Sequence, residues 1–202
     1  MKKILVGTAA AVLFALPLVP SHAAVPSCFG RKATIVGTKG DDNLIGTSGV
    51  DVIVGLGGND RLWGGHGGSD FLCAGRGLDH IESEGNDTSS GDAGNDWIEG
   101  SNGAEKMYGK DGDDQLQAEG DEYYGDGISD GSNTLYGGDG NDIIGGDTEG
   151  NNPDKLYGNL GNDTMYGADQ APDTVDGSGG TGDECTVDSS DTVLQCEKVT
   201  TR

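Results

Sequence analysis

The sequence repeats with a period of nine residues. Acidic side chains recur at this interval at Asp42, Asp51 and Asp60, and an apolar side chain stands two residues after nearly every such acid. Glycine-rich stretches precede the acids, and the most regular units span residues 137–145 and 158–166. A nine-residue period is too long for a helical turn and too regular for a linker, so it restricts the chain to a repeat architecture.

Each unit divides into a turn of about six residues and a strand of about three. Glycine allows the positive φ values that such turns need, and the alternation of strand side chains directs one apolar residue per unit inward. Two units form one coil, so stacked coils place the apolar residues in columns and the acids in two rows. The sequence therefore predicts an all-β fold, a parallel β-solenoid. The expected inward residues are Leu44, Ile53, Leu62, Leu72, Ile81, Ile98, Met107, Leu116, Leu135, Ile144, Leu156, Met165 and Val175.

These units resemble the RTX (hemolysin-type) calcium-binding repeats, whose consensus is G-G-x-G-x-D-x-U-x. The resemblance covers roughly residues 36–184 and is weak at 83–90, 118–132 and 146–153. It implies a parallel β-roll that holds several Ca²⁺ ions between adjacent turns on the same side.

Calcium takes six to eight oxygen ligands, which two stacked turns can supply and one short turn cannot. Partner acids should therefore lie about eighteen residues apart, two repeat units. This spacing pairs Asp42 with Asp60, Asp51 with Asp70, Asp60 with Asp79, and Asp96 with Asp114. The predicted metal ligands are Asp42, Asp51, Asp60, Asp70, Asp79, Asp96, Asp114, Asp142, Asp154, Asp163 and Asp173. Glu105 and Asn133 depart from the pattern, so weaker or absent ions are expected there.

Stacked rows of carboxylates repel one another, and Ca²⁺ would neutralise them and cross-link the coils, so that binding energy becomes folding energy. The alternative is a disordered acidic, glycine-rich chain. The column of apolar residues in phase with the acids favours the folded state.

The net charge of −23 argues against nucleic acid and anionic membranes as partners. After residue 23 there is no long apolar run, so no membrane span is expected there. The 39 glycines add little buried area, which excludes an ordinary globular core.

The first residues have the pattern of a secretory signal. Lys2 and Lys3 precede an apolar run over residues 4–19, and the small residues Ser21 and Ala23 suit cleavage before Ala24. The alternative is an uncleaved anchor. A secreted, extracellular protein is expected. The predicted organisation is a signal peptide over 1–23, an N-terminal cap over 24–35, calcium-binding repeats over 36–184 and a C-terminal cap over 185–202.

Four cysteines in an exported chain suggest two disulfides, with three possible connectivities. Cys185 and Cys196 are close in sequence and are paired on that ground, which leaves Cys28 with Cys73. Free buried thiols are the alternative.

Tyr108, Tyr136, Tyr157 and Tyr166 each follow an inward residue and should form an outward ladder on one sheet face. The ladder serves either packing or an adhesive function, binding a glycan or a cell surface. No H-E-x-x-H motif is present, and a G-x-S-x-G string at 127–131 lacks the strand and helix that such a motif needs. We expect a calcium-binding monomer with no catalytic residues.

Overall fold

The computed structural model describes residues 24–101, 103–118, 131–146, 152–168 and 170–202. The regular elements within these ranges are all strands. The strands are β1 (Ser27–Cys28), β2 (Arg31–Lys32), β3 (Ile35–Val36), β4 (Asn43–Ile45), β5 (Val52–Val54), β6 (Arg61–Trp63), β7 (Phe71–Arg76), β8 (His80–Glu82), β9 (Thr88–Ala93), β10 (Trp97–Glu99), β11 (Lys106–Asp111), β12 (Gln115–Gln117), β13 (Thr134–Asp139), β14 (Ile143–Gly145), β15 (Lys155–Leu160), β16 (Thr164–Tyr166), β17 (Thr174–Ser178), β18 (Glu184–Val187), β19 (Thr192–Leu194) and β20 (Lys198–Thr201). Over the same residues there is no helix long and apolar enough to span a membrane.

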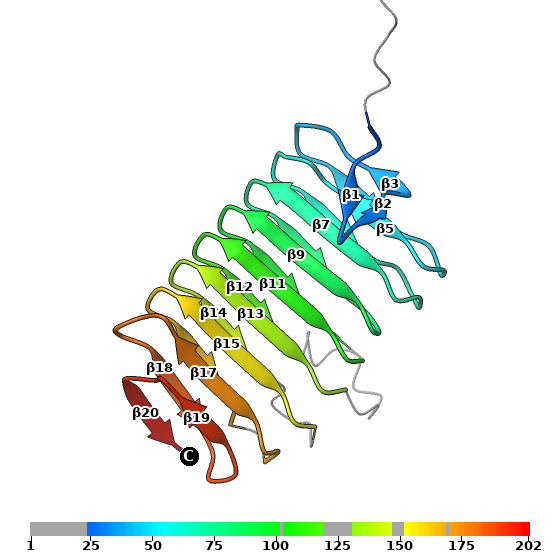
Figure 1. The fold of residues 1–202 in the computed structure, drawn as a ribbon. Helices are drawn as coiled ribbons and strands as arrows, with labels where there is room; N and C mark the ends of the chain where they lie inside the picture. Colours follow the sequence, from blue (N-terminus) through cyan, green and yellow to red (C-terminus); the bar gives the residue numbers. More distant parts are fainter. Residues whose placement is uncertain (1–23, 102, 119–130, 147–151, 169) are drawn as a thin grey trace, which may run out of the picture.

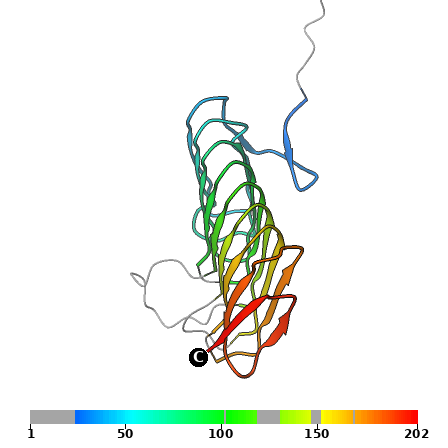
Figure 2. The ribbon, with the colours of Figure 1, turned by 90° about the vertical axis from the view of Figure 1, so that its left-hand side faces the viewer.

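Two parallel sheets of nine strands each form the body of the molecule (Figure 1). One sheet contains the odd-numbered strands β3 to β19, and the other contains the even-numbered strands β4 to β20. The chain alternates between them, so each coil adds one strand to each sheet, and the coils stack as flattened loops along one axis (Figure 2). The predicted parallel β-solenoid is confirmed.

A single core runs between the two sheets. The middle residue of each three-residue strand points inward, as at Leu62, Ile81 and Ile98, which are all fully buried. The remaining predicted inward residues belong to the same core cluster, with Leu44 partly buried near its N-terminal end. Burial of each such side chain stabilises the fold by about 2 kcal/mol. The nine-residue period therefore places one large apolar side chain per half-coil, and little else, inside.

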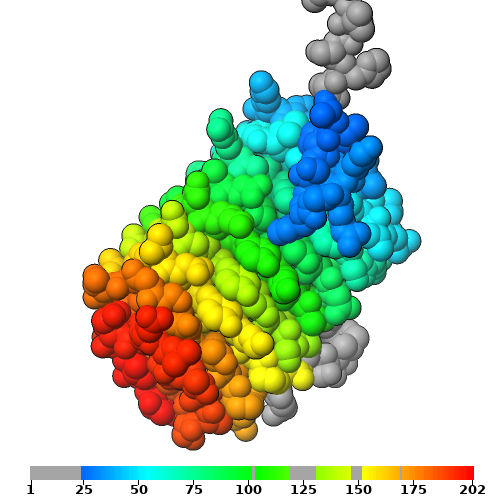
Figure 3. Space-filling model, in the orientation of Figure 1, coloured from blue at the N-terminus to red at the C-terminus, as the bar shows by residue number. Residues whose placement is uncertain are grey.

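The N-terminal segment covers a sheet face and not the open end of the solenoid. Strands β1 and β2 form an antiparallel hairpin that packs on the outer face of the odd-strand sheet, as the blue atoms in Figure 3 show. Under it, Val52 and Val54 are buried although they flank the inward Ile53. The disulfide Cys28–Cys73 joins the hairpin to β7. Residues 1–23, predicted as a signal peptide, lie outside the described residues.

Residues 185–202, expected to cover the last coil, themselves continue the two sheets. Strand β19 pairs with β17, and β20 pairs with β18, in the same parallel register as the strands before them. The disulfide Cys185–Cys196 ties this segment together. Both disulfides have the pairing expected from the sequence.

Candidate metal centre

The repeat acids line the two long edges of the solenoid, where the chain passes from one sheet to the other. We call the turns that lead from odd to even strands the Asp42 edge and the turns that lead from even to odd strands the Asp51 edge. The Asp42 edge carries Asp42, Asp60, Asp79, Asp96, Asp114, Asp142, Asp163 and Asp183. The Asp51 edge carries Asp51, Asp70, Asp87, Glu105, Asn133, Asp154, Asp173 and Asp191.

Hydrogen bonds link each acid to the acid of the next coil. The backbone N–H of Asp42 donates to Oδ1 of Asp60 at 2.8 Å. The same bond joins Asp51 to Asp70, Asp60 to Asp79, and Asp96 to Asp114, at 2.7 to 2.8 Å. These are the four pairs that the eighteen-residue spacing predicts, and the structure brings each pair together. Along the Asp42 edge the series continues from Asp114 to Asp142, Asp163 and Asp183.

The second carboxylate oxygen lacks a donor at most positions of the Asp42 edge. Oδ2 is buried and has no hydrogen-bond partner among the described residues at Asp60, Asp79, Asp96, Asp114, Asp142, Asp163 and Asp183. These seven residues are between 0% and 3% exposed. An unsatisfied buried carboxylate oxygen is costly, so a row of seven indicates that a proton or a cation completes the site.

At every turn of this row except the one before Asp79, which begins with Ala74, a glycine lets Oδ2 approach its backbone closely. A Cβ atom on Gly177 would lie 2.5 Å from Oδ2 of Asp183 and 2.5 Å from the carbonyl oxygen of Gln195 in the next coil. At Gly109, a Cβ atom would likewise meet Oδ2 of Asp114 and the carbonyl oxygen of Gly137. The glycine thus lets a carboxylate oxygen and a backbone carbonyl oxygen from successive coils come close together, which a side chain at its position would prevent. Oxygen ligands of these two kinds are those that Ca²⁺ prefers.

Burial makes the carboxylates of this edge hard to ionise. Burial is the main cause that raises the pKa of Asp96 and Asp142 to about 7, with a smaller contribution from nearby carboxylates, and it outweighs the opposing effect of the backbone hydrogen bond. Burial also raises the pKa of Asp79 and Asp114 to about 6. Near neutral pH, these groups are therefore poised between binding a proton and binding a cation.

The Asp51 edge is less uniform. Oδ2 of Asp51 accepts hydrogen bonds from the backbone N–H and the hydroxyl of Thr47 at 2.6 and 2.8 Å. Burial raises the pKa of Asp51, but the hydrogen bonds from Thr47 and Thr34 outweigh it and lower the pKa overall. Glu105 and Asn133 interrupt the row at its centre, as the sequence indicates. The first turn of the other edge resembles Asp51, since Thr38 donates to Oδ2 of Asp42.

Besides Glu105 and Asp191, two edge acids were not among the predicted ligands. Asp183 has a buried Oδ2 of the kind described above, and Asp87 extends the Asp51 edge, accepting the backbone N–H of Asp70 at 2.7 Å. Burial raises the pKa of Asp87 to about 6. Both residues stand eight to ten residues from the preceding repeat acid and could have been found by allowing the period to vary by one.

The aromatic ladder is shorter than predicted. Tyr108, Tyr136 and Tyr157 align on the odd-strand sheet, but Tyr166 belongs to β16 of the other sheet. The prediction was wrong for Tyr166 because it follows Tyr157 by nine residues, which is half a coil.

The family model of the RTX calcium-binding nonapeptide repeat matches residues 36–68, 45–81, 83–116, 129–152 and 150–172. The chain belongs to this RTX family. Comparison with curated proteins finds no match. The solenoid is thus an RTX β-roll, and its edge turns are calcium-binding repeats. Among the described residues, no three His, Cys, Asp or Glu side chains gather into one cluster. The RTX turns instead place single carboxylates beside backbone carbonyl groups.

Proposed function

We propose that this RTX protein binds several Ca²⁺ ions, chiefly along the Asp42 edge, and that calcium holds its β-roll together. One observation supports the proposal most strongly, which is the row of buried Oδ2 atoms without donors. At Asp60, Asp114, Asp142, Asp163 and Asp183 this oxygen lies beside a glycine that is also close to a carbonyl oxygen of the neighbouring coil. The proposed ligands on this edge are the carboxylates of Asp60, Asp79, Asp96, Asp114, Asp142, Asp163 and Asp183. Bound Ca²⁺ supplies positive charge that offsets the buried carboxylates and links one coil to the next.

The two carboxylate oxygens of each aspartate have different roles. Oδ1 of each aspartate accepts the backbone N–H of the preceding coil and so fixes the carboxylate, as at Asp114, which accepts from Asp96. At all of these aspartates except Asp79, Oδ2 is thereby directed toward the glycine of its own turn. On the Asp51 edge we assign the same role to Asp70, Asp154 and Asp173.

Asp42 and Asp51, both predicted as ligands, are placed outside the proposed set. Oδ2 of Asp42 already accepts two hydrogen bonds from Thr38, and Oδ2 of Asp51 accepts two from Thr47. The threonine turns therefore satisfy these carboxylates without an ion. The proposed role is one of binding and structure and not of catalysis.

The substitution Asp142→Asn tests the proposed row, with Asp51→Asn as the matched control. Asp142→Asn should remove at least one ion from the protein and weaken calcium binding by roughly tenfold, about 1.4 kcal/mol, because an amide oxygen carries no charge. Asp51→Asn should leave the number of ions unchanged. Native mass spectrometry counts the ions, and calorimetric titration measures their affinity. Loss of an ion from Asp51→Asn but not from Asp142→Asn would contradict the assignment.

We also propose that the protein is exported, with residues 1–23 removed and the repeats of 36–184 binding calcium. Residues 24–35 would cover the outer face of the odd-strand sheet, and residues 185–202 would complete the two sheets at the other end. The two disulfides support export, because disulfides persist in oxidising compartments. When the full chain is expressed in a secreting bacterium, the medium should contain a protein whose mass corresponds to a start at Ala24. Intact mass and N-terminal sequencing check this outcome. Retention of residue 1 in a cell-associated product would contradict it.

A further inference from the structure

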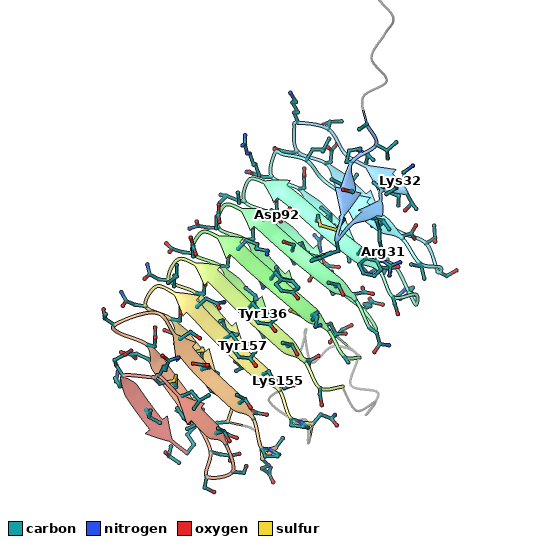
Figure 4. The ribbon with its side chains drawn as sticks, in the orientation of Figure 1. Arg31, Lys32, Asp92, Tyr136, Lys155 and Tyr157 are labelled. Carbon is teal, nitrogen blue, oxygen red and sulfur yellow. A yellow bond between two sulfur atoms is a disulfide. The ribbon has the colours of Figure 1, made fainter. Side chains whose placement is uncertain are left out.

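The outer face of the odd-strand sheet carries a row of tyrosines between basic side chains. Tyr108, Tyr136 and Tyr157 occupy the same register position on β11, β13 and β15. Lys106 and Lys155 lie two residues before their tyrosines, toward the Asp51 edge. We define the tyrosine–lysine stripe as Tyr108, Tyr136, Tyr157, Lys106, Lys110 and Lys155. Figure 4 shows Tyr136, Tyr157 and Lys155 on the same face as Arg31 and Lys32 of the N-terminal hairpin.

The rings of the stripe stack on one another. The ring centroids of Tyr108 and Tyr136 are 5.0 Å apart with an angle of 4° between planes, and those of Tyr136 and Tyr157 are 4.9 Å apart at 9°. Phe29 of the hairpin lies at the end of the stack, with its ring centroid 5.6 Å from that of Tyr108 and its plane tilted by 44°. Because neighbouring rings cover each other's faces, a sugar cannot stack flat on them. The ladder therefore offers ring edges and hydroxyl groups on a rigid support.

The basic residues of this face form no ion pair within the described residues, although the chain is strongly acidic. On the opposite, even-strand sheet, Arg61 contacts Glu82 and Lys198 contacts Glu184 at 2.7 Å. Lys2 and Lys3 are two of the twelve basic residues, so ten follow residue 23. Five of those ten lie on this one face: Arg31, Lys32, Lys106, Lys110 and Lys155. Arg31 lies over the ring of Phe71 at 4.1 Å and Lys110 over the ring of Tyr108 at 5.1 Å. The cations of this face are thus gathered here without a carboxylate partner among the described residues.

We propose that the tyrosine–lysine stripe binds a linear polysaccharide that carries uronate carboxylates. Lys106 and Lys155 occupy one register row with Thr134 between them, so their strands are two spacings, roughly 10 Å, apart. An extended 1,4-linked sugar chain directs every second sugar to the same side, which gives its carboxylates a similar repeat. Such a chain would lie along the solenoid axis, with its carboxylates toward the lysines and its hydroxyl groups toward the tyrosines.

The acidic groups near the stripe are engaged by their own neighbours. Asp92 accepts a hydrogen bond from the hydroxyl of Ser90 at 2.7 Å, and Asp176 accepts from Gln195 at 3.2 Å. Asp111 and Asp139 stand at the strand ends toward the Asp42 edge. The net charge of −23 opposes any polyanion. Each Ca²⁺ ion bound at an edge would reduce that opposition by two charges and leave the lysines of the stripe exposed to a ligand.

The double variant Lys106→Gln/Lys155→Gln tests the stripe, and Arg61→Gln/Lys198→Gln removes the same charge from the opposite sheet as a control. Each protein is loaded with Ca²⁺, and circular dichroism verifies that it is folded. A hyaluronan oligosaccharide is the probe, because its carboxylates recur on every second sugar, and an uncharged cello-oligosaccharide of equal length is the control ligand. The stripe variant should bind hyaluronan roughly tenfold more weakly or worse, through the loss of two charge-assisted contacts. The control variant should bind like the parent protein.

The proposal would be overturned if the folded parent protein failed to bind hyaluronan, or if both double variants bound it equally. It would also be overturned if the uncharged sugar bound as well as hyaluronan. Equal competition by phosphatidylserine vesicles or a DNA duplex would also overturn it, because the stripe would then be a general polyanion site. If the carboxylates of the polysaccharide instead bound through Ca²⁺ at the solenoid edges, the lysine substitutions would not change hyaluronan binding, and this result would also contradict the proposal. Failure of this test and failure of the proposed calcium row can be distinguished. The hyaluronan experiment requires only a folded protein, whereas the Asp142→Asn experiment counts the bound ions.

Discussion

In a chelating buffer at pH 7.5, the protein is expected to lose most of its β-sheet circular dichroism signal, and added Ca²⁺ is expected to restore it. Mg²⁺ at the same concentration should not, because it is smaller, requires near-octahedral geometry and gives up its water reluctantly. Far-ultraviolet spectra recorded during titration with each ion measure this difference.

The energies explain why the effect should be large. A rise in the pKa of Asp96 from 3.8 to about 7 corresponds to roughly 4 kcal/mol against the ionised form in the folded chain. Asp142 has a rise of the same size, and Asp79 and Asp114 have smaller ones. Whole domains are stable by only about 5 to 15 kcal/mol, so a few such residues are enough to cancel the stability of a calcium-free roll at pH 7.5.

Substitutions separate this explanation from a general effect of ions. Asp96→Asn/Asp142→Asn removes two of the buried charges, so this variant should keep more of its sheet signal in chelator than the parent protein keeps. Asp51→Asn is the control, since the pKa of Asp51 is lowered and its charge is already stabilised. A parent protein whose spectrum is unchanged by chelation would show that the apolar core and the disulfides alone suffice, and the prediction would be wrong.

The interior and the pairing of the acids could be predicted from the sequence, because both follow from the nine-residue period alone. Ile98 and Leu116 are inward because each stands two residues after an acid. Asp96 and Asp114 are neighbours because eighteen residues make one coil. Such rules need no knowledge of contacts between distant parts of the chain.

Features outside the repeat could not be predicted in this way. The hairpin over Val52 and Val54 depends on a tertiary contact of a segment that has no repeat, although two valines flanking an inward isoleucine are a signal that this outer face is covered. The difference between Asp51 and Asp142 depends on neighbouring groups, because the backbone N–H and hydroxyl of Thr47 donate to Oδ2 of Asp51, whereas Oδ2 of Asp142 has no donor among the described residues. The repeat period determines where a carboxylate lies. The hydrogen-bond donors around that carboxylate determine whether one of its oxygens remains available to a metal ion.

Protonation of the buried carboxylates should stabilise the folded chain in the absence of calcium. In chelator, lowering the pH from 8 to 5 is expected to restore the sheet signal and to raise the melting temperature. The folded-state pKa values of Asp79, Asp96, Asp114 and Asp142 are raised to about 6 or 7, above the value of 3.8 for an unburied carboxyl. The folded chain therefore binds more protons than the unfolded chain between about pH 7 and pH 4. Stability gained by these protons is fully present below pH 4 and is lost as the pH rises through 6 and 7.

With saturating calcium the sign should reverse, because protons then compete with Ca²⁺ for the same carboxylate oxygens. The calcium-loaded protein should lose stability as the pH falls from 7 to 5, while the calcium-free protein gains it, so the two curves of melting temperature against pH converge on the acidic side. Asp51, whose pKa is lowered, opposes the gain in the calcium-free protein at the lowest pH. Asp96→Asn/Asp142→Asn should flatten both curves, since two of the titrating groups are gone. A calcium-free protein that becomes less stable from pH 7 to pH 5 would show that its edge carboxylates are ionised in the folded state, and the burial argument for a cation row would fail with it.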